Sequence, residues 1–323
     1  MSKKVVTFGE IMLRLATPGY QRFSQATEFT ATFGGGEANV SVSLANYGME
    51  SEFVTRLPQN DIARSCEMDL HKHGVKTDHV IYGGDRLGIY FLETGAVARA
   101  SKVVYDRAHS AIAEIKPGMI DWDEVLKGAD WFHWTGITPA LSKSARAASE
   151  VLNAQARKAG CFFSFDPNLR PQLWTSREEM ANCINSLAYR SDLFLPGIKE
   201  AELLIGETEP RKIAAHYLER GTKTVVVKLG PKGAYYICDN GDSGCVDGFH
   251  VEHVVDTVGA GDGFAVGVLS AWREGLPLDM AVQRGCAVGA IQVMSRGDND
   301  GLPSREELDA FMAGQKDWRR HSA

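Results

Sequence analysis

The sequence predicts an α/β protein in which a mostly parallel β-sheet is covered by helices and accompanied by a small second sheet. From about residue 53 onward, short β-prone runs alternate with helical patterns. Strands arranged in this way need crossover connections, which make the sheet parallel and place helices on both of its faces. The length of 323 residues suffices for one such core, and we expect a single domain over residues 1–323.

The individual elements follow from hydrophobic periodicity and from the turn residues that flank each run. The first strand is expected at Val5–Phe8. Further strands are expected at 131–134, 161–166, 192–195 and 224–228. Helices are expected at 142–158, 177–190, 199–205, 211–220, 260–272 and 279–294.

Two β-rich segments interrupt this alternation. Residues 11–33 contain a Pro18-Gly19 turn between alternating β-prone positions, and residues 87–110 contain a hairpin with arms at 88–94 and 102–107. We expect the two segments to form a small sheet over the ligand-binding edge, where it would act as a lid. A hairpin that only decorates the surface fits the pattern equally well.

Composition and charge disfavour several classes of partner. The formal net charge is −6 and no long basic run is present, which disfavours binding to nucleic acid. No apolar stretch approaches the ~20 residues of a membrane span, and no signal peptide opens the chain. The six cysteines are scattered without a Cys-x-x-Cys pair, which is typical of reduced thiols. We therefore expect a cytoplasmic protein.

The most informative segment is Asp256–Gly263, at the beginning of the apolar helix predicted over 260–272. Its glycines allow close backbone approach, and the unpaired N–H groups at the start of a helix favour an anion. Asp262 places a carboxylate in the same turn. An anion nest beside a fixed base suits the transfer of a phosphoryl group to a hydroxyl.

Other interpretations of this segment are weaker. A glycine-rich turn before a helix is often only a tight connection. A dinucleotide fingerprint that begins at Gly259 would need Gly or Ala at position 264, where Phe264 stands. A Walker-type phosphate loop is excluded, because the dipeptide Gly-Lys occurs nowhere in the chain.

A second glycine cluster, Gly34, Gly35 and Gly36, is followed by Asn39 and a helical pattern. These glycines would let the backbone approach a polyol closely, and Asn39 offers it both a donor and an acceptor. A flexible turn that only caps a helix is the alternative.

Polar residues also follow two of the predicted strands directly. Asp166-Pro167-Asn168 comes after the strand at 161–166, and Lys228-Leu229-Gly230 comes after the strand at 224–228. Ligands of parallel sheets bind outside the carboxyl ends of the strands, so both groups belong to the ligand edge.

Taken in order, these segments and the Gly34–Asn39 cluster resemble the signatures of the ribokinase-like (PfkB) carbohydrate kinases. The resemblance extends from about Val5 to Leu308, and Asp256–Asp262 is its most specific part. It implies a three-layer α/β/α core with a β-sheet lid, and ATP and Mg²⁺ as cofactors. Some relatives also have a monovalent-cation site, which the sequence does not assign.

The resemblance also implies roles for individual residues. Asp262 would be the general base, and the backbone of Gly259, Ala260 and Gly261 would hold the transferring phosphoryl group. The nucleotide would be bound by Asn168, Lys228, Gly230, Gly233, Gly259 and Gly261.

Within the family, the 2-keto-3-deoxygluconate kinases are most similar. The matching substrate residues are Gly34, Gly35, Gly36, Asn39, Tyr90, Tyr105, Arg107, Arg170 and Asp298. A sugar acid carries a carboxylate, which guanidinium groups bind in a bidentate manner. The implied reaction is ATP-dependent formation of the 6-phosphate of 2-keto-3-deoxygluconate. A fructokinase or ribokinase activity is the alternative within the family, and a dehydrogenase or a non-catalytic sugar sensor the alternative outside it.

Two positions depart from the family pattern. Asp106 replaces the middle tyrosine of the Tyr-Tyr-Arg motif, and Gly197 stands where many members have the asparagine of Asn-x-x-Glu. Glu200 keeps the glutamate, which would contact Mg²⁺ through water. The expected partners are a sugar acid, ATP and, through the exposed edge of the lid, a second copy of the chain.

Overall fold

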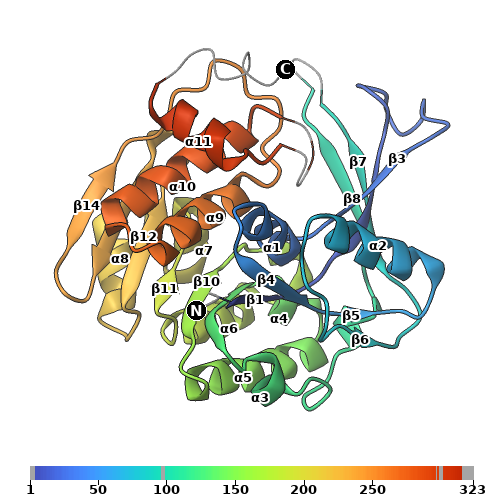
Figure 1. The fold of residues 1–323 in the computed structure, drawn as a ribbon, viewed down its shortest axis with the longest axis horizontal. Coiled ribbons are helices and arrows are strands. Elements are labelled where there is room, and N and C mark those ends of the chain that lie inside the picture. Colours follow the sequence, from blue (N-terminus) through green and yellow to red (C-terminus); the bar gives the residue numbers. More distant parts are fainter. Residues whose placement is uncertain (1–3, 96–98, 296, 298–300, 315–323) are drawn as a thin grey trace.

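The computed structural model describes residues 4–95, 99–295, 297 and 301–314. An eight-stranded sheet crosses the molecule in the order β14-β13-β12-β11-β10-β9-β1-β4 (Figure 1). The six strands from β12 to β4 are parallel, while β13 pairs antiparallel with β12 and β14 pairs antiparallel with β13. The strands are β1 (Lys4–Phe8), β4 (Glu50–Val54), β9 (Ala129–Thr135), β10 (Phe162–Asp166), β11 (Leu193–Phe194), β12 (Thr224–Lys228), β13 (Ala234–Cys238) and β14 (Ser243–Val246). The predicted α/β class is confirmed.

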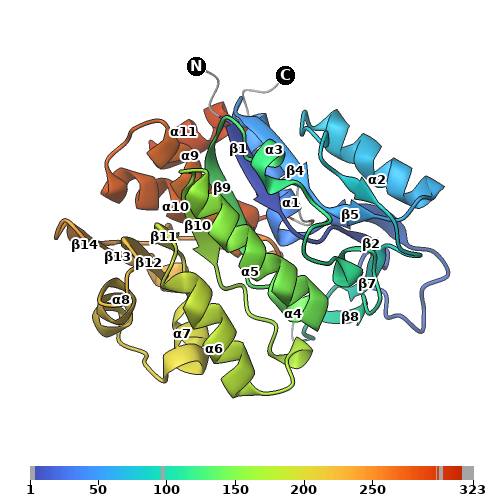
Figure 2. The same cartoon turned by 90° about the horizontal axis from the view of Figure 1, so that it is seen from below.

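Helices cover both faces of this sheet, because successive side chains of a strand point to opposite faces (Figures 1 and 2). One face packs against α3 (Trp122–Val125), α4 (Thr138–Leu141), α5 (Lys143–Lys158), α6 (Arg177–Ala188), α7 (Ile198–Ile205) and α8 (Pro210–Leu218). The other face packs against α1 (Gly36–Asn46), α9 (Ala260–Arg273) and α10 (Leu278–Gln292). Two further helices, α2 (Asp61–Lys72) and α11 (Arg305–Met312), pack against α1 and α10 respectively.

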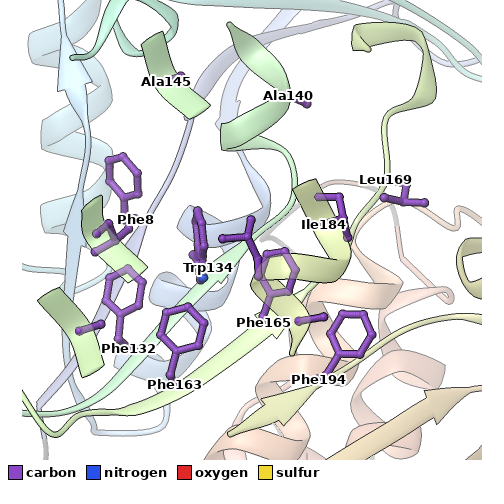
Figure 3. Close-up of a cluster of buried hydrophobic side chains, with 14 of the residues drawn as sticks. Phe8, Phe132, Trp134, Ala140, Ala145, Phe163, Phe165, Leu169, Ile184 and Phe194 are labelled. Atoms are coloured by element: carbon purple, nitrogen blue, oxygen red, sulfur yellow. The ribbon is translucent and has the colours of Figure 1, made fainter. Parts of the chain in front are cut away.

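Aromatic side chains form the interior of the first face (Figure 3). Phe132 stacks on Phe163 of the neighbouring strand, with ring centroids 5.8 Å apart, and Phe165 stacks on Phe194 at 5.9 Å. Trp134 lies fully buried beside Phe165. Burial of these rings fixes the register of β9, β10 and β11, and therefore fixes where the polar residues after each strand emerge.

The small sheet has the order β3-β2-β7-β8 and lies beside the carboxyl end of the main sheet (Figure 1). Its strands are β2 (Met12–Ala16), β3 (Thr30–Gly34), β7 (Gly88–Glu93) and β8 (Lys102–Asp106). The expected hairpin is the antiparallel pair β7–β8, and β2 pairs with β7 in parallel. All of β8 is exposed, so it forms an open edge.

Several elements were not predicted. They are β4, the antiparallel pair β13 and β14, the short pair β5 (Arg56–Leu57) and β6 (Ile81–Tyr82), and helices α2, α3, α4 and α11. Short strands separated by turns carry little periodicity, and only their pairing with an existing sheet stabilises them. Among the described residues, no helix is both long and apolar enough to cross a membrane.

Candidate active site

A cavity of about 370 Å³ opens where the carboxyl ends of the central strands meet the small sheet and the first turns of α1 and α9. Of the residues singled out in the sequence, the lining includes Gly34, Gly35, Gly36, Asn39, Tyr90, Tyr105, Arg107, Asn168, Arg170, Glu200, Lys228, Gly259, Gly261 and Asp262. Ala260, Gly230 and Gly233 are not among the lining residues. Asp298 lies outside the described residues. Segments from all parts of the chain thus converge on one site.

The two glycines that precede and begin α1 are required by close packing. A Cβ atom at Gly35 would lie 2.0 Å from the carbonyl oxygen of Glu10, which no side chain could tolerate. A Cβ atom at Gly36 would lie 3.2 Å from Nδ2 of Asn168 and 3.5 Å from Oδ1 of Asp262. The backbone of this cluster therefore approaches both Asn168 and the predicted base.

Asp262 lies in the first turn of α9, directly after a left-handed N-cap at Gly259 (φ 75°). That conformation favours glycine. Its carboxylate oxygen Oδ2 accepts a hydrogen bond of 2.8 Å from Nδ2 of Asn39. The preceding loop is held to α10, since Nε2 of Gln292 donates to the carbonyl oxygen of Val258. The helix start is thus anchored on two sides.

Lys228 lines the cavity and contributes a positively charged side chain. Its Nζ donates to Oδ2 of Asp166 at 2.5 Å, and a Cβ atom at Gly261 would lie 3.9 Å from the same Nζ. Burial disfavours the charge, but the carboxylates of Asp166 and Glu200 outweigh this effect and raise the pKa of Lys228. The lysine is therefore charged at neutral pH, beside the start of α9.

Arg107 directly follows strand β8 of the small sheet, and only 6% of its surface is exposed. Its Nη2 donates to Oε2 of Glu10, and Ser110 donates to the other oxygen of the same carboxylate at 2.9 Å. Its guanidinium also lies 5.2 Å from the ring centroid of Tyr105. Within the described part of the chain, the buried Nε has no hydrogen-bond partner. Arg107, which lines the cavity, thus keeps one N–H donor without a partner among the described residues.

Glu10 also lines the cavity, although the sequence pattern did not identify it as a site residue. It lies two residues beyond the end of strand β1, so its position near the carboxyl edge of the sheet was the available signal.

Asp106 does not disturb the cavity. Tyr105 and Arg107 on either side of it line the cavity, and alternate residues of a strand point to opposite faces. Its carboxylate accepts a hydrogen bond of 2.7 Å from Arg86, on the exposed side of the sheet. The departure from the family motif therefore lies away from the site.

Arg170 and Asn168 both line the cavity and are hydrogen-bonded to each other. Nη1 of Arg170 donates to Oδ1 of Asn168 at 2.7 Å and to the carbonyl oxygens of Asn168 and Leu169. Asn168 has a φ of 35°, and Gly36 is its close neighbour. Asn168 therefore lies beside the glycine cluster of α1, on the side predicted to bind the sugar.

Glu200 is held by two backbone donors. Its oxygens accept hydrogen bonds from the N–H groups of Leu169 at 3.0 Å and Gly197 at 2.7 Å. Burial raises its pKa, and Asp166 adds to the effect while Lys228 opposes it. The contact with Gly197 caps α7, so the glycine serves here through its backbone N–H.

Glu37 is a completely buried carboxyl group behind the site. Oε1 accepts hydrogen bonds from the backbone N–H of Thr135 at 3.0 Å and from its hydroxyl at 2.7 Å. Oε2 has no partner among the described residues. A Cβ atom at Gly9 would lie 2.2 Å from the carboxyl carbon, so a glycine is needed there. Burial raises the pKa of Glu37 to about 7, although the Thr135 hydrogen bonds oppose the shift.

Other candidate metal or redox groups are absent from the described residues. No cluster of three or more His, Cys, Asp or Glu side chains that could hold a metal ion occurs there. The six cysteines, all of which the structure describes, are free thiols. Burial lowers the pKa of His133 to about 3, so this histidine is a neutral core residue.

The pKa of Glu37 predicts a pH-dependent stability. Because the folded chain binds this proton more tightly than the unfolded chain, stability is lost as pH rises from 4.5 to about 7. Glu37→Gln removes the ionisation. Relative to the parent chain, the variant should gain up to about 3 kcal/mol of unfolding free energy between acidic and mildly alkaline pH. Urea denaturation across this pH range measures the difference. An exposed control, Glu178→Gln, should show none, and parallel stability curves for Glu37→Gln and the parent would contradict the assignment.

Several known proteins are similar to this chain in sequence and structure. Residues 2–305 match the model of the pfkB family carbohydrate kinases. The 2-dehydro-3-deoxygluconokinase of Bacillus subtilis is 39% identical, with 98% of this chain and 97% of that protein covered. The 2-dehydro-3-deoxygalactonokinase of Haloferax volcanii is 31% identical over 92% of this chain and 93% of that protein. The crystal structure of 2-dehydro-3-deoxygluconokinase from Thermotoga maritima superposes with a TM-score of 0.87 at 35% identity, over 97% of this chain and 100% of that chain. The chain therefore belongs to the pfkB family and is a carbohydrate kinase.

Proposed function

We propose that the protein phosphorylates 2-keto-3-deoxygluconate with ATP and forms its 6-phosphate. The observation that carries this proposal is the buried guanidinium of Arg107, whose Nε–H lacks a partner within the described residues, in the cavity that also contains Asp262. A buried N–H without a partner is costly, and a substrate carboxylate would satisfy it. The similarity to 2-dehydro-3-deoxygluconokinases supports the same substrate class.

The chemistry follows from the placement of charges. Asp262 accepts the proton of the terminal hydroxyl while that oxygen forms a bond to the γ-phosphorus and the bond to the leaving ADP breaks. At the start of α9, the backbone N–H groups of Gly259 and Gly261, which line the cavity, would face the negative charge of the transferring group. The N–H of Ala260 donates to the carbonyl oxygen of Thr257 at 3.4 Å and would join them only if this contact opens. Lys228 adds a positive charge beside Gly261.

The carboxylates at the cavity floor suit a Mg²⁺ ion that keeps its waters. Asp166 and Glu200 already accept hydrogen bonds from Lys228 and from backbone N–H groups, so they are not arranged to coordinate a metal directly. Glu200 lines the cavity and would contact the ion through water, while the phosphates of ATP supply the direct ligands. The bound ion would neutralise phosphate charge during transfer.

The small sheet would act as the lid over the sugar. Tyr90 and Tyr105 are cross-strand neighbours with ring centroids 6.0 Å apart, and both line the cavity. Closure would exclude water, which otherwise competes with the sugar as acceptor. The exposed edge strand β8, in which Val104 is 52% exposed, would pair with a second copy of the chain. The mass of the protein in solution, measured by light scattering, tests for this dimer.

A fructokinase activity is the second candidate. The Glu10 carboxylate already compensates the charge of Arg107, and a neutral pair of this kind also suits a neutral sugar. Two observations favour the sugar acid nonetheless, since Arg107 keeps a donor without a partner among the described residues and Arg170 places a second guanidinium on the cavity wall.

Substitution of the base tests the mechanism. Asp262→Asn should lower kcat by roughly a hundredfold or more and leave ATP binding intact, because an amide cannot accept the hydroxyl proton. A coupled assay of ADP release measures kcat, and titration measures ATP binding. Asp279, an exposed aspartate in the first turn of the neighbouring helix α10, provides the control Asp279→Asn. Turnover of Asp262→Asn near that of the control would remove the base assignment.

The substrate class is tested by a panel of sugars and a double variant. Arg107→Ala alone would leave Glu10 buried and unpaired, so the informative protein is Arg107→Ala with Glu10→Gln. Loss of the charge-assisted hydrogen bonds should raise KM for the keto-deoxy acid by roughly 10- to 100-fold without changing KM for ATP. The single variant Glu10→Gln, which keeps Arg107, should not raise KM for the acid to this extent. Faster phosphorylation of fructose than of the keto-deoxy acid by the parent enzyme would favour the fructokinase.

A further inference from the structure

The side chain of Asn39 is hydrogen-bonded to two other groups of the protein. Its Oδ1 accepts a hydrogen bond of 3.3 Å from the N–H of Gly35, and its Nδ2 donates to Oδ2 of Asp262 at 2.8 Å. Only 4% of its surface is exposed. The sequence pattern predicts Asn39 as a sugar ligand, and in the structure each half of its amide also has a partner within the protein.

The backbone around Asn39 makes this contact rigid. Asn39 lies in the first turn of α1, where its N–H donates to the carbonyl oxygen of Gly35 at 2.7 Å. Its own carbonyl oxygen accepts a hydrogen bond of 2.8 Å from the hydroxyl of Ser43. The first turns of α1 and α9 thus meet side by side, with Asn39 on one and Asp262 on the other.

From this geometry we propose that Asn39 is the positioning residue of the base: it holds Oδ2 of Asp262 and so fixes the plane of the carboxylate against the acceptor hydroxyl. The terminal torsion of an aspartate has broad, shallow minima, so an unanchored carboxylate samples many orientations. Proton transfer requires a hydrogen-bonded approach of defined geometry. A donor on one carboxylate oxygen supplies that geometry and also favours the ionised form of the base. The inference rests on the proposed role of Asp262 as base.

Other charged groups face the same carboxylate. From α1, the buried Glu37 interacts unfavourably with Asp262, and from the end of β12, Lys228 interacts favourably with it. Lys228 is itself bound to Asp166 at the end of β10 and is influenced by Glu200 of α7. From the lid, Arg107 and its partner Glu10 line the same cavity, as does Arg170 from the loop after β10. Any test based on pH must therefore separate Asn39 from Glu37.

The most direct test is Asn39→Asp, which keeps the shape of the side chain. Its Oδ1 still accepts the Gly35 N–H, but a carboxylate oxygen replaces the donor that faces Asp262. Two carboxylates at this distance raise the pH at which the site loses its last proton. In the profile of kcat/KM against pH, measured with the acceptor sugar as substrate, the midpoint of the acidic limb should rise by at least about one pH unit. The KM for ATP should be unchanged. The exposed Asn46→Asp, at the end of α1, should leave the profile unchanged.

Two further variants keep the test decisive. Asn39→Ala removes the donor without adding a charge, so kcat should fall by about tenfold or more with a smaller displacement of the limb, even if Asn39→Asp folds poorly. In the double variant Asn39→Asp with Glu37→Gln, the displacement should persist. A displacement that disappears there would place the effect on Glu37 and overturn the proposal.

An effect of Asn39→Ala on KM in place of kcat would also overturn the proposal. If Asn39 is a sugar ligand, Asn39→Ala should raise KM for the sugar with little change in kcat and an unmoved acidic limb. The profile is measured on whichever sugar the parent enzyme phosphorylates, so an error in the proposed substrate would show in the panel of acceptors and leave this test intact. An error in the base itself would show as high turnover of Asp262→Asn.

Discussion

The ion pair between Lys228 and Asp166 is the interaction on which the arrangement of the site depends. It joins the ends of β12 and β10 across the cavity floor, and Glu200, from the segment after the intervening strand β11, adds a second carboxylate nearby. Removal of either partner would leave an uncompensated buried charge, which is among the most costly defects a protein can have. The same pair keeps the lysine charged beside the first turn of α9, where the phosphoryl group is proposed to bind. This ion pair therefore links the carboxyl ends of β10 and β12 and also keeps the positive charge of Lys228 in the site.

The features visible in the sequence were those encoded by neighbouring residues. The glycine segments at 34–36 and 259–263, and the polar residues after β10 and β12, each signal a turn or strand end through local composition, and the structure brings them to one cavity. The parallel sheet was likewise predictable from periodicity, because buried strands and covering helices have distinct spacings. The strands β13 and β14 were not, since they depend on an existing sheet to pair with.

The partners of individual side chains could not be obtained from the sequence. Asn39 and Asp262 are 223 positions apart, and Glu10 and Arg107 are 97 positions apart. Neither contact has a local signature, because each forms only when α1, α9, β1 and the small sheet assemble. Both contacts change the interpretation of the residues involved. Asn39 becomes a partner of the proposed base, and Arg107 becomes half of an ion pair whose Nε–H has no partner among the described residues.

The strand that carries Tyr105 is also the least enclosed strand of the small sheet, with every residue from Lys102 to Asp106 exposed. Few buried apolar contacts hold it, so its local opening requires much less free energy than the unfolding of the aromatic-lined strands behind it. Backbone amides of β8 should therefore exchange hydrogen with solvent long before those of β9 and β10. In the lid proposed above, entry of the sugar and release of its product would then need only this margin of the molecule to fray, while the strands of the main sheet stay assembled.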